Sequence, residues 1–136
     1  MLSPSQLRRY VFPWHKAIID LAHSCGRPVI LHSCGNYTMI LDDLFSLGYD
    51  GRHSYEDNII PVEKAYEQFQ GKIAVMGGID MDFLVRSSPE QIRERCEAIL
   101  QKTGCRGYAL GSGNSIPEYV PFENYLAMIE TAKRSL

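Results

Sequence analysis

The sequence predicts an α/β fold in which four strand–helix units form a parallel sheet, preceded by a helix at the N-terminus. Short runs rich in apolar and β-branched residues alternate with longer runs whose apolar residues recur at helical spacing. This alternation repeats four times within 136 residues. Each short run also leads into a polar cluster. Together these patterns are typical of a parallel sheet covered by helices.

The N-terminal helix is predicted from Ser3 and Pro4, an N-cap followed by proline at the first helical position. Pro13 lies within the apolar periodicity that follows, so the helix either kinks there or is preceded by a shorter one. Tyr10 and Trp14 belong to this periodicity, and we expect them in the core.

The first strand is predicted at residues 28–31, which are apolar on both faces and therefore expected to be buried. Asn36 is the expected N-cap of the next helix, which carries apolar residues over 39–47 and ends at Gly48. A second, less apolar strand is predicted at residues 49–55.

A helix that begins with proline is predicted at residues 61–69, followed by a third strand at 72–76. After a short helical turn, a serine–proline pair opens a long helix over 88–104. The fourth strand is predicted at residues 107–110, and a last helix runs from about residue 121 to the C-terminus.

Composition indicates one domain over residues 1–136, with 45% apolar and 22% charged residues and no linker. A net charge of −2 gives no electrostatic reason to expect nucleic acid or an anionic membrane as a partner. No apolar run is long enough to cross a bilayer. Four cysteines without a signal peptide favour a cytoplasmic setting.

The polar clusters that follow the four strands are the predicted site of function. They cover residues 32–36, 53–57, 77–80 and 111–115. Parallel strands bring their carboxyl ends to one face, so we expect these clusters to converge although they are far apart in sequence.

His32 and Cys34 are the strongest candidates within these clusters. They lie two residues apart, so extended backbone directs both side chains to the same side. Neutral imidazole and thiolate are good zinc ligands, and the pair therefore predicts part of a metal site. The alternative is a buried thiol beside a histidine that is satisfied by hydrogen bonds.

Candidate acid–base residues follow the second and third strands. His53 is a possible third ligand or general acid/base, with Glu56 or Asp57 orienting it, or else part of a hydrogen-bonded turn. Asp80 either acts on the substrate or caps the following helix.

Substrate contacts are expected from Gly78, Ser112 and Asn114. The glycine-rich turn at residues 111–113 could cradle an anion with its backbone N–H groups. It lacks the lysine of a Walker motif and the spacing of a dinucleotide fingerprint, so it specifies no nucleotide.

Taken together, the stretches 28–36, 53–57, 77–80 and 121–124 resemble the C-terminal half of the uroporphyrinogen decarboxylase superfamily. The superfamily includes zinc-containing, cobalamin-dependent methyltransferases, which pass a methyl group from a corrinoid protein to a thiol. The resemblance covers nearly the whole chain. It implies a TIM (β/α)8 barrel, of which this chain carries the last four strand–helix units.

The resemblance also implies roles for individual residues. His32 and Cys34 match the zinc pair of the methyltransferases, which the true decarboxylases lack. The methyltransferases take a third ligand, a cysteine, from the loop where this chain has residues 113–115, and the decarboxylases have a histidine at about Asn114. The implied cofactors are Zn²⁺ and a corrinoid carried by a partner protein.

The leading expectation is zinc-dependent methyl transfer to a small-molecule thiol. One alternative is a metal-free uroporphyrinogen decarboxylase of porphyrin biosynthesis, with Asp80 as its carboxylate. Another is a non-catalytic half-barrel that binds a ligand or a second subunit. A complete barrel needs about 250 residues. We therefore expect either pairing of two copies or completion by an N-terminal half barrel of a longer protein.

Overall fold

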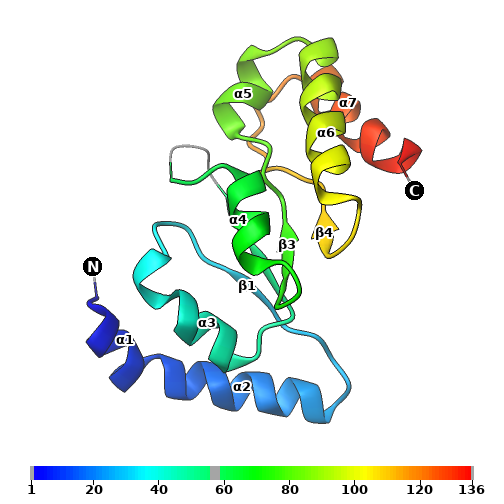
Figure 1. Cartoon of the computed structure of the whole chain (residues 1–136). Helices are drawn as coiled ribbons and strands as arrows, with labels where there is room; N and C mark the ends of the chain where they lie inside the picture. The colour runs from blue at the N-terminus through cyan, green and yellow to red at the C-terminus, as the bar shows by residue number, and fades with distance from the viewer. Residues whose placement is uncertain (1, 56–58, 136) are drawn as a thin grey trace.

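A computed structural model describes residues 2–55 and 59–135 of the chain (Figure 1). In chain order the elements are α1 Pro4–Tyr10, α2 Phe12–Ser24, β1 Ile30–His32, the 3₁₀ helix η1 Thr38–Ile40, α3 Leu41–Leu47, β2 Gly51–His53, α4 Val62–Phe69, β3 Ala74–Met76, α5 Met81–Arg86, α6 Pro89–Thr103, β4 Tyr108–Ala109 and α7 Phe122–Arg134. The four predicted strand–helix units are present in the predicted order.

The four strands form one parallel sheet in the order β1-β2-β3-β4. Its register pairs Leu31 with Arg52 and Arg52 with Val75, and one residue further on it pairs His32 with His53. Successive side chains of a strand point to opposite faces. Leu31, Arg52 and Val75 therefore share one face of the sheet, and the two histidines share the other.

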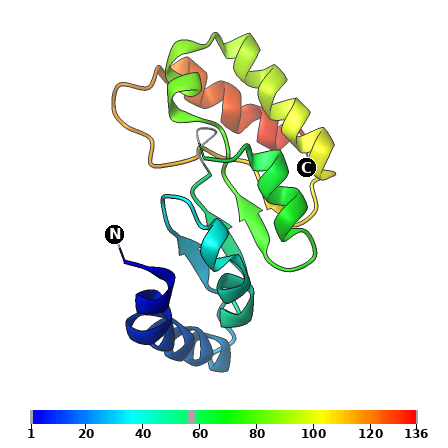
Figure 2. The ribbon, with the colours of Figure 1, turned by 60° about the vertical axis from the view of Figure 1, so that its left-hand side comes forward.

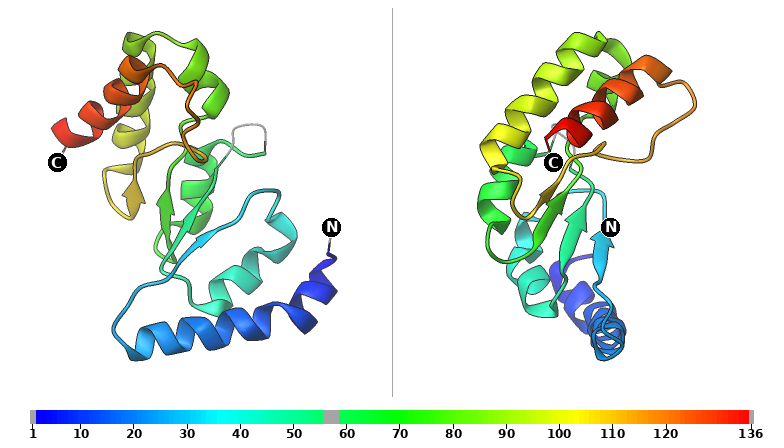
Figure 3. Two further views of the ribbon diagram at one scale, coloured as in Figure 1. Left: turned by 180° about the vertical axis from the view of Figure 1, so that it is seen from behind. Right: turned by 90° about the vertical axis from the view of Figure 1, so that its right-hand side faces the viewer.

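The two faces of the sheet have different surroundings. Helices α3, α4 and α6 lie on one side of the strands in the right-hand view of Figure 3, and Val75 on that side is fully buried. On the other side Ile30 is 51% exposed, and His32 is exposed as well. The prediction that the first strand is buried on both faces is therefore wrong. β1 is an edge strand, and the described residues supply no layer that covers its second face.

The N-terminal run consists of two helices, because Pro13 lies in the first turn of α2 rather than inside one continuous helix. Tyr10 and Trp14, expected in the core, are instead 58% and 71% exposed. Ile18 and Leu21 of α2 are also exposed. The helical periodicity was predicted correctly, but only part of its apolar face meets the rest of the described chain.

The entry to α3 also differs from the prediction. The Asn36 side chain accepts a hydrogen bond from the Thr38 N–H at 2.9 Å, but Tyr37 is the N-cap of the 3₁₀ helix η1, and α3 starts only at Leu41. Gly48 ends α3 in the left-handed conformation, as predicted.

Aromatic rings form the centre of the core between the sheet and helices α3 and α4. The ring of Phe69 lies 5.4 Å from those of Tyr37 and Phe45 and 6.1 Å from that of Tyr55, all in edge-to-face geometry. This cluster joins the loops after β1 and β2 to α4, and so it supports the carboxyl end of the sheet.

Helices α6 and α7 pack side by side at the C-terminal end of the fold (Figure 2). A capping box between Ser88 and Gln91 starts α6, and Gly104 ends it in the left-handed conformation. Within the described part of the chain, no helix is both long enough and apolar enough to traverse a bilayer.

Candidate functional site

The segments that follow β1, β2 and β4 meet at the carboxyl end of the sheet. The Asn114 amide donates to Cys34 Sγ at 3.6 Å, and the Ser54 hydroxyl donates to the same sulfur at 3.3 Å. His53 Nε2 lies 3.0 Å from the carbonyl oxygen of Ser112. Residues 77–80 join them, because the Ile79 N–H donates to the Gly111 carbonyl at 3.0 Å and the Ile79 carbonyl accepts from the Gly113 N–H at 2.7 Å. All four polar clusters thus meet, as the parallel topology predicts.

His32 and Cys34 lie on the same side of the chain, as their spacing predicts. His32 Nε2 is 3.6 Å from Cys34 Sγ, and both residues are exposed. A tetrahedral zinc ion with ordinary bond lengths to nitrogen and sulfur holds those two atoms about 3.5 Å apart. The pair therefore fits two positions of a zinc site that solvent and small molecules can reach.

No third ligand joins this pair among the described residues, which contain no cluster of three His, Cys, Asp or Glu side chains able to hold a metal. His53, the candidate third ligand or general acid/base, contacts the ring nitrogen of His32 that does not face Cys34. Its Nδ1 is 2.6 Å from His32 Nδ1, and its Nε2 contacts the Ser112 carbonyl. Glu56 and Asp57, expected to orient His53, lie outside the described residues.

The other predicted site residues have structural contacts. Asp80 caps α5, because its Oδ1 accepts hydrogen bonds from the backbone N–H groups of Asp82 and Phe83. Gly78 has φ of 113°, and a Cβ there would lie 2.6 Å from Val62. Tight packing against α4 thus accounts for this glycine without a ligand.

Two further glycines allow the loops to converge. A Cβ on Gly77 would lie 2.4 Å from the Ser112 carbonyl oxygen, and one on Gly113 would lie 2.2 Å from that of Tyr55. The Ser112 hydroxyl donates to the Asn114 carbonyl at 2.6 Å and so closes the turn after β4. Ser112 and Asn114 therefore shape the loop that contacts Cys34.

Arg52 is a residue whose role sequence reasoning missed. It is only 1% exposed, and its guanidinium lies 4.0 Å from the Tyr37 ring centre and 4.8 Å from that of Tyr55. Burial raises the pKa of Tyr55 to about 12 and also raises that of Tyr37, so both rings are neutral phenols at pH 7.

Arg52 donates to the carbonyls of Ser33 at 2.8 Å and Ser54 at 3.1 Å. It thereby ties the loop that carries Cys34 to the segment that follows His53 at the end of β2. Strand alternation was the available signal, since it places Arg52 on the face opposite His53.

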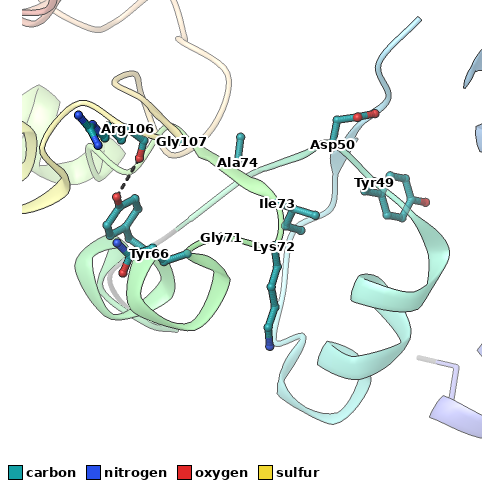
Figure 4. Close-up of a pocket in the computed structure, with 10 residues that line it drawn as sticks. Tyr49, Asp50, Tyr66, Gly71, Lys72, Ile73, Ala74, Arg106 and Gly107 are labelled. Atoms are coloured by element: carbon teal, nitrogen blue, oxygen red, sulfur yellow. Dashed lines mark hydrogen bonds between the residues drawn. The ribbon is translucent and has the colours of Figure 1, made fainter. Parts of the chain in front are cut away.

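A concave region with a volume of about 310 Å³ lies at the amino ends of the strands (Figure 4). Its polar side chains do not converge on one point. The Tyr66 hydroxyl donates to the Arg106 carbonyl at 2.8 Å, and Lys72 Nζ lies 4.0 Å from the ring centre of Phe45. Active sites of parallel α/β folds lie at the opposite end of the strands. We therefore place the candidate site around Cys34.

Comparison with known proteins identifies the family to which this fold belongs. The model of the family described as "Uroporphyrinogen decarboxylase (URO-D)" matches residues 1–135. The chain belongs to the URO-D family. The match extends over all four strands and all seven α-helices of the described chain.

URO-D relatives of two kinds are similar to the chain. A methylated-thiol–coenzyme M methyltransferase of Methanosarcina mazei is 28% identical over 137 residues, which cover 99% of the chain and 35% of the relative. A uroporphyrinogen decarboxylase of Synechococcus is 28% identical over 142 residues, covering 98% of the chain and 36% of the relative. The chain thus spans about a third of the length of these relatives.

A solved structure shows the same architecture. The structure of a methyltransferase from Methanosarcina mazei matches with a TM-score of 0.78 at 23% identity, over 98% of this chain and 38% of that one. The fold is therefore half of a TIM barrel, as the URO-D resemblance implied.

Proposed function

We propose that this chain is part of a zinc-dependent methyltransferase that moves a methyl group from a corrinoid, carried by a partner protein, to the thiol of a small molecule. The observation that carries the proposal is the 3.6 Å separation of His32 Nε2 and Cys34 Sγ at the carboxyl end of the sheet. The similarity to a relative named as a methylated-thiol–coenzyme M methyltransferase supports it.

In this proposal His32 and Cys34 hold the metal. A bound zinc ion supplies Lewis acidity, which lowers the pKa of a coordinated thiol and favours the nucleophilic thiolate. The Ser54 hydroxyl and the Asn114 amide both donate to Cys34 Sγ, and such hydrogen bonds stabilise negative charge on the sulfur. Both ligands follow the carboxyl end of β1, and this is the end of the strands at which TIM barrels bind their substrates.

Zinc content tests the proposal directly. We expect purified wild-type chain to retain zinc after dialysis and Cys34→Ser to lose most of it. Cys105→Ser is the matched control, because Cys105 is also exposed but follows α6, outside the site. Equal zinc content in all three proteins, with unchanged circular dichroism spectra, would contradict the proposal.

Uroporphyrinogen decarboxylation is the second candidate, because several relatives with 27–29% identity bear that name. The structure supports decarboxylation less well than methyl transfer. Asp80, the candidate carboxylate for decarboxylation, uses one of its oxygens to cap α5. Turnover of uroporphyrinogen without bound zinc would favour the decarboxylase. Absence of both zinc and turnover in a protein of full family length would instead favour a non-catalytic binding module.

A further inference from the structure

His32 and His53 are neighbours on the open face of the sheet. The register pairs their backbones across β1 and β2, and their rings lie 4.8 Å apart with an angle of 33° between planes. Their Nδ1 atoms are 2.6 Å apart. At this separation one nitrogen donates a proton and the other accepts it, because two N–H groups or two lone pairs would repel.

Ser112 determines the direction of this hydrogen bond. A carbonyl oxygen can only accept, so the 3.0 Å contact with the Ser112 carbonyl requires a proton on His53 Nε2. When His53 is neutral, this is its one ring proton, and a lone pair remains on His53 Nδ1. His32 Nδ1 is then the donor. The remaining nitrogen, His32 Nε2, keeps its lone pair and faces Cys34 Sγ at 3.6 Å.

We propose that His53 is a positioning residue that fixes the tautomer of His32. It accepts the His32 Nδ1 proton and is itself anchored to the Ser112 carbonyl, so that His32 presents an unprotonated Nε2 toward Cys34. The tautomer needs no metal, whereas its use in zinc binding rests on the proposed function. Metal-ligating histidines commonly donate their other N–H to a fixed acceptor, and here a second histidine provides that acceptor.

The packing around His53 keeps this arrangement in place. A Cβ on Gly77 would lie 3.0 Å from the His53 ring and 2.4 Å from the Ser112 oxygen, so only glycine lets that carbonyl approach the ring this closely. The side chain of His53 is half-buried, whereas His32 is exposed. The better fixed ring therefore orients the more accessible one.

Two variants separate positioning from simple structural support. His53→Phe keeps the ring volume and removes the acceptor, whereas His53→Asn places an amide oxygen close to the position of Nδ1. Long-range ¹H–¹⁵N NMR of the metal-free protein, above the ordinary histidine pKa of about 6.5, reports the tautomer of His32. We expect the Nδ1–H tautomer in wild type and in His53→Asn, and its loss in His53→Phe.

Zinc affinity, measured by chelator competition, provides the second readout. We expect it to fall about 10- to 100-fold in His53→Phe, in the range for lost outer-shell partners, and to recover largely in His53→Asn. His23→Phe is the control, because His23 pairs with Asp50 at 2.8 Å, outside the site.

The outcomes distinguish the two proposals. A proton on His32 Nε2 in wild type, or an unchanged tautomer and affinity in His53→Phe, would overturn the positioning role alone. A wild-type chain that shows the Nδ1–H tautomer and its loss in His53→Phe, yet binds no zinc, would support the positioning role and overturn the proposed zinc chemistry.

Discussion

At the scale of single residues, the site depends on side chains on both faces of the sheet. His32 and Cys34 were predictable from the sequence because their spacing fixes their common direction in extended backbone. Arg52 was not, because arginine in a short strand is ordinarily exposed. Its burial became visible only when the rings of Tyr37 and Tyr55 were placed around it.

Replacing Arg52 with Met should destabilise the fold by about 1–3 kcal/mol, the cost of leaving the buried Ser54 carbonyl without its donor. In the variant, the carbonyls of Ser33 and Ser54 both lose their donor. The free energy lost in this way exceeds the free energy gained by no longer burying a guanidinium charge. Urea unfolding measures the difference. Arg93→Met, which removes a more exposed pair with Glu90, should change stability by less than about 0.5 kcal/mol. Equal stability of Arg52→Met and wild type would refute the role given to Arg52.

Gly77→Ala should destabilise the protein more than Gly71→Ala. Both glycines have positive φ, 92° and 76° respectively. An alanine held in this left-handed backbone conformation costs about 1–2 kcal/mol of stability, and both variants share that loss. Only at Gly77 would the new Cβ also meet the Ser112 carbonyl, since no atom lies within 4 Å of one at Gly71. The difference in unfolding free energy between the two variants isolates this contact. If the two lose the same stability, the close approach at Ser112 is not a constraint.

At the scale of elements, the caps and the order of helices and strands followed from local sequence. The serine–proline starts of α1 and α6 both form capping boxes, and glycines end α3 and α6 as predicted. Local sequence did not predict that one face of β1 is exposed. Apolar residues on both sides of a strand do not reveal whether its neighbours belong to the same chain, and for β1 one neighbour is missing from the described residues.

An ion pair between α4 and α6 should make stability depend on pH. Arg95 donates to both carboxylate oxygens of Glu63, and these hydrogen bonds lower the pKa of Glu63 below its usual 4.5. The stabilisation is complete above about pH 4.5 and is lost as the pH falls through the lowered folded-state pKa. Glu63→Gln should therefore lose less stability than wild type between pH 5 and about pH 3. Chemical unfolding across this range measures how the unfolding free energy of each protein changes with pH. The same change in both proteins would contradict the expectation.

At the scale of the whole molecule, half a barrel leaves surfaces uncovered. Trp14, Ile18 and Leu21 line the exposed side of α2, and Ile18 and Ile30 share a groove of about 220 Å³ between α2 and β1. The sequence indicated this incompleteness through its length, because a barrel needs nearly twice as many residues. It did not indicate which apolar residues would remain exposed.

Expressed alone, the chain should associate with a second copy through this surface. Burying one side chain of this size contributes about 1.5–3 kcal/mol, and a pair of copies that meet through the same surface loses two of them. Ile18→Lys should therefore weaken association by at least about 100-fold. Met39→Lys is the control, because Met39 is 76% exposed but lies in η1. Sedimentation velocity measures the effect. A well-folded wild-type monomer at tens of micromolar would count against self-association and favour completion by other parts of a longer protein.

The outer edge of β1 has a thermodynamic consequence for the site. His32 ends this strand and Cys34 lies two residues beyond, yet among the described strands only β2 holds β1 in place. A polypeptide that bound this edge and restricted the motion of the two ligands would raise their affinity for metal by some factor. Linkage then requires the metal to strengthen the attachment of that polypeptide by the same factor. Barrel closure and metal loading would thus be reciprocal events.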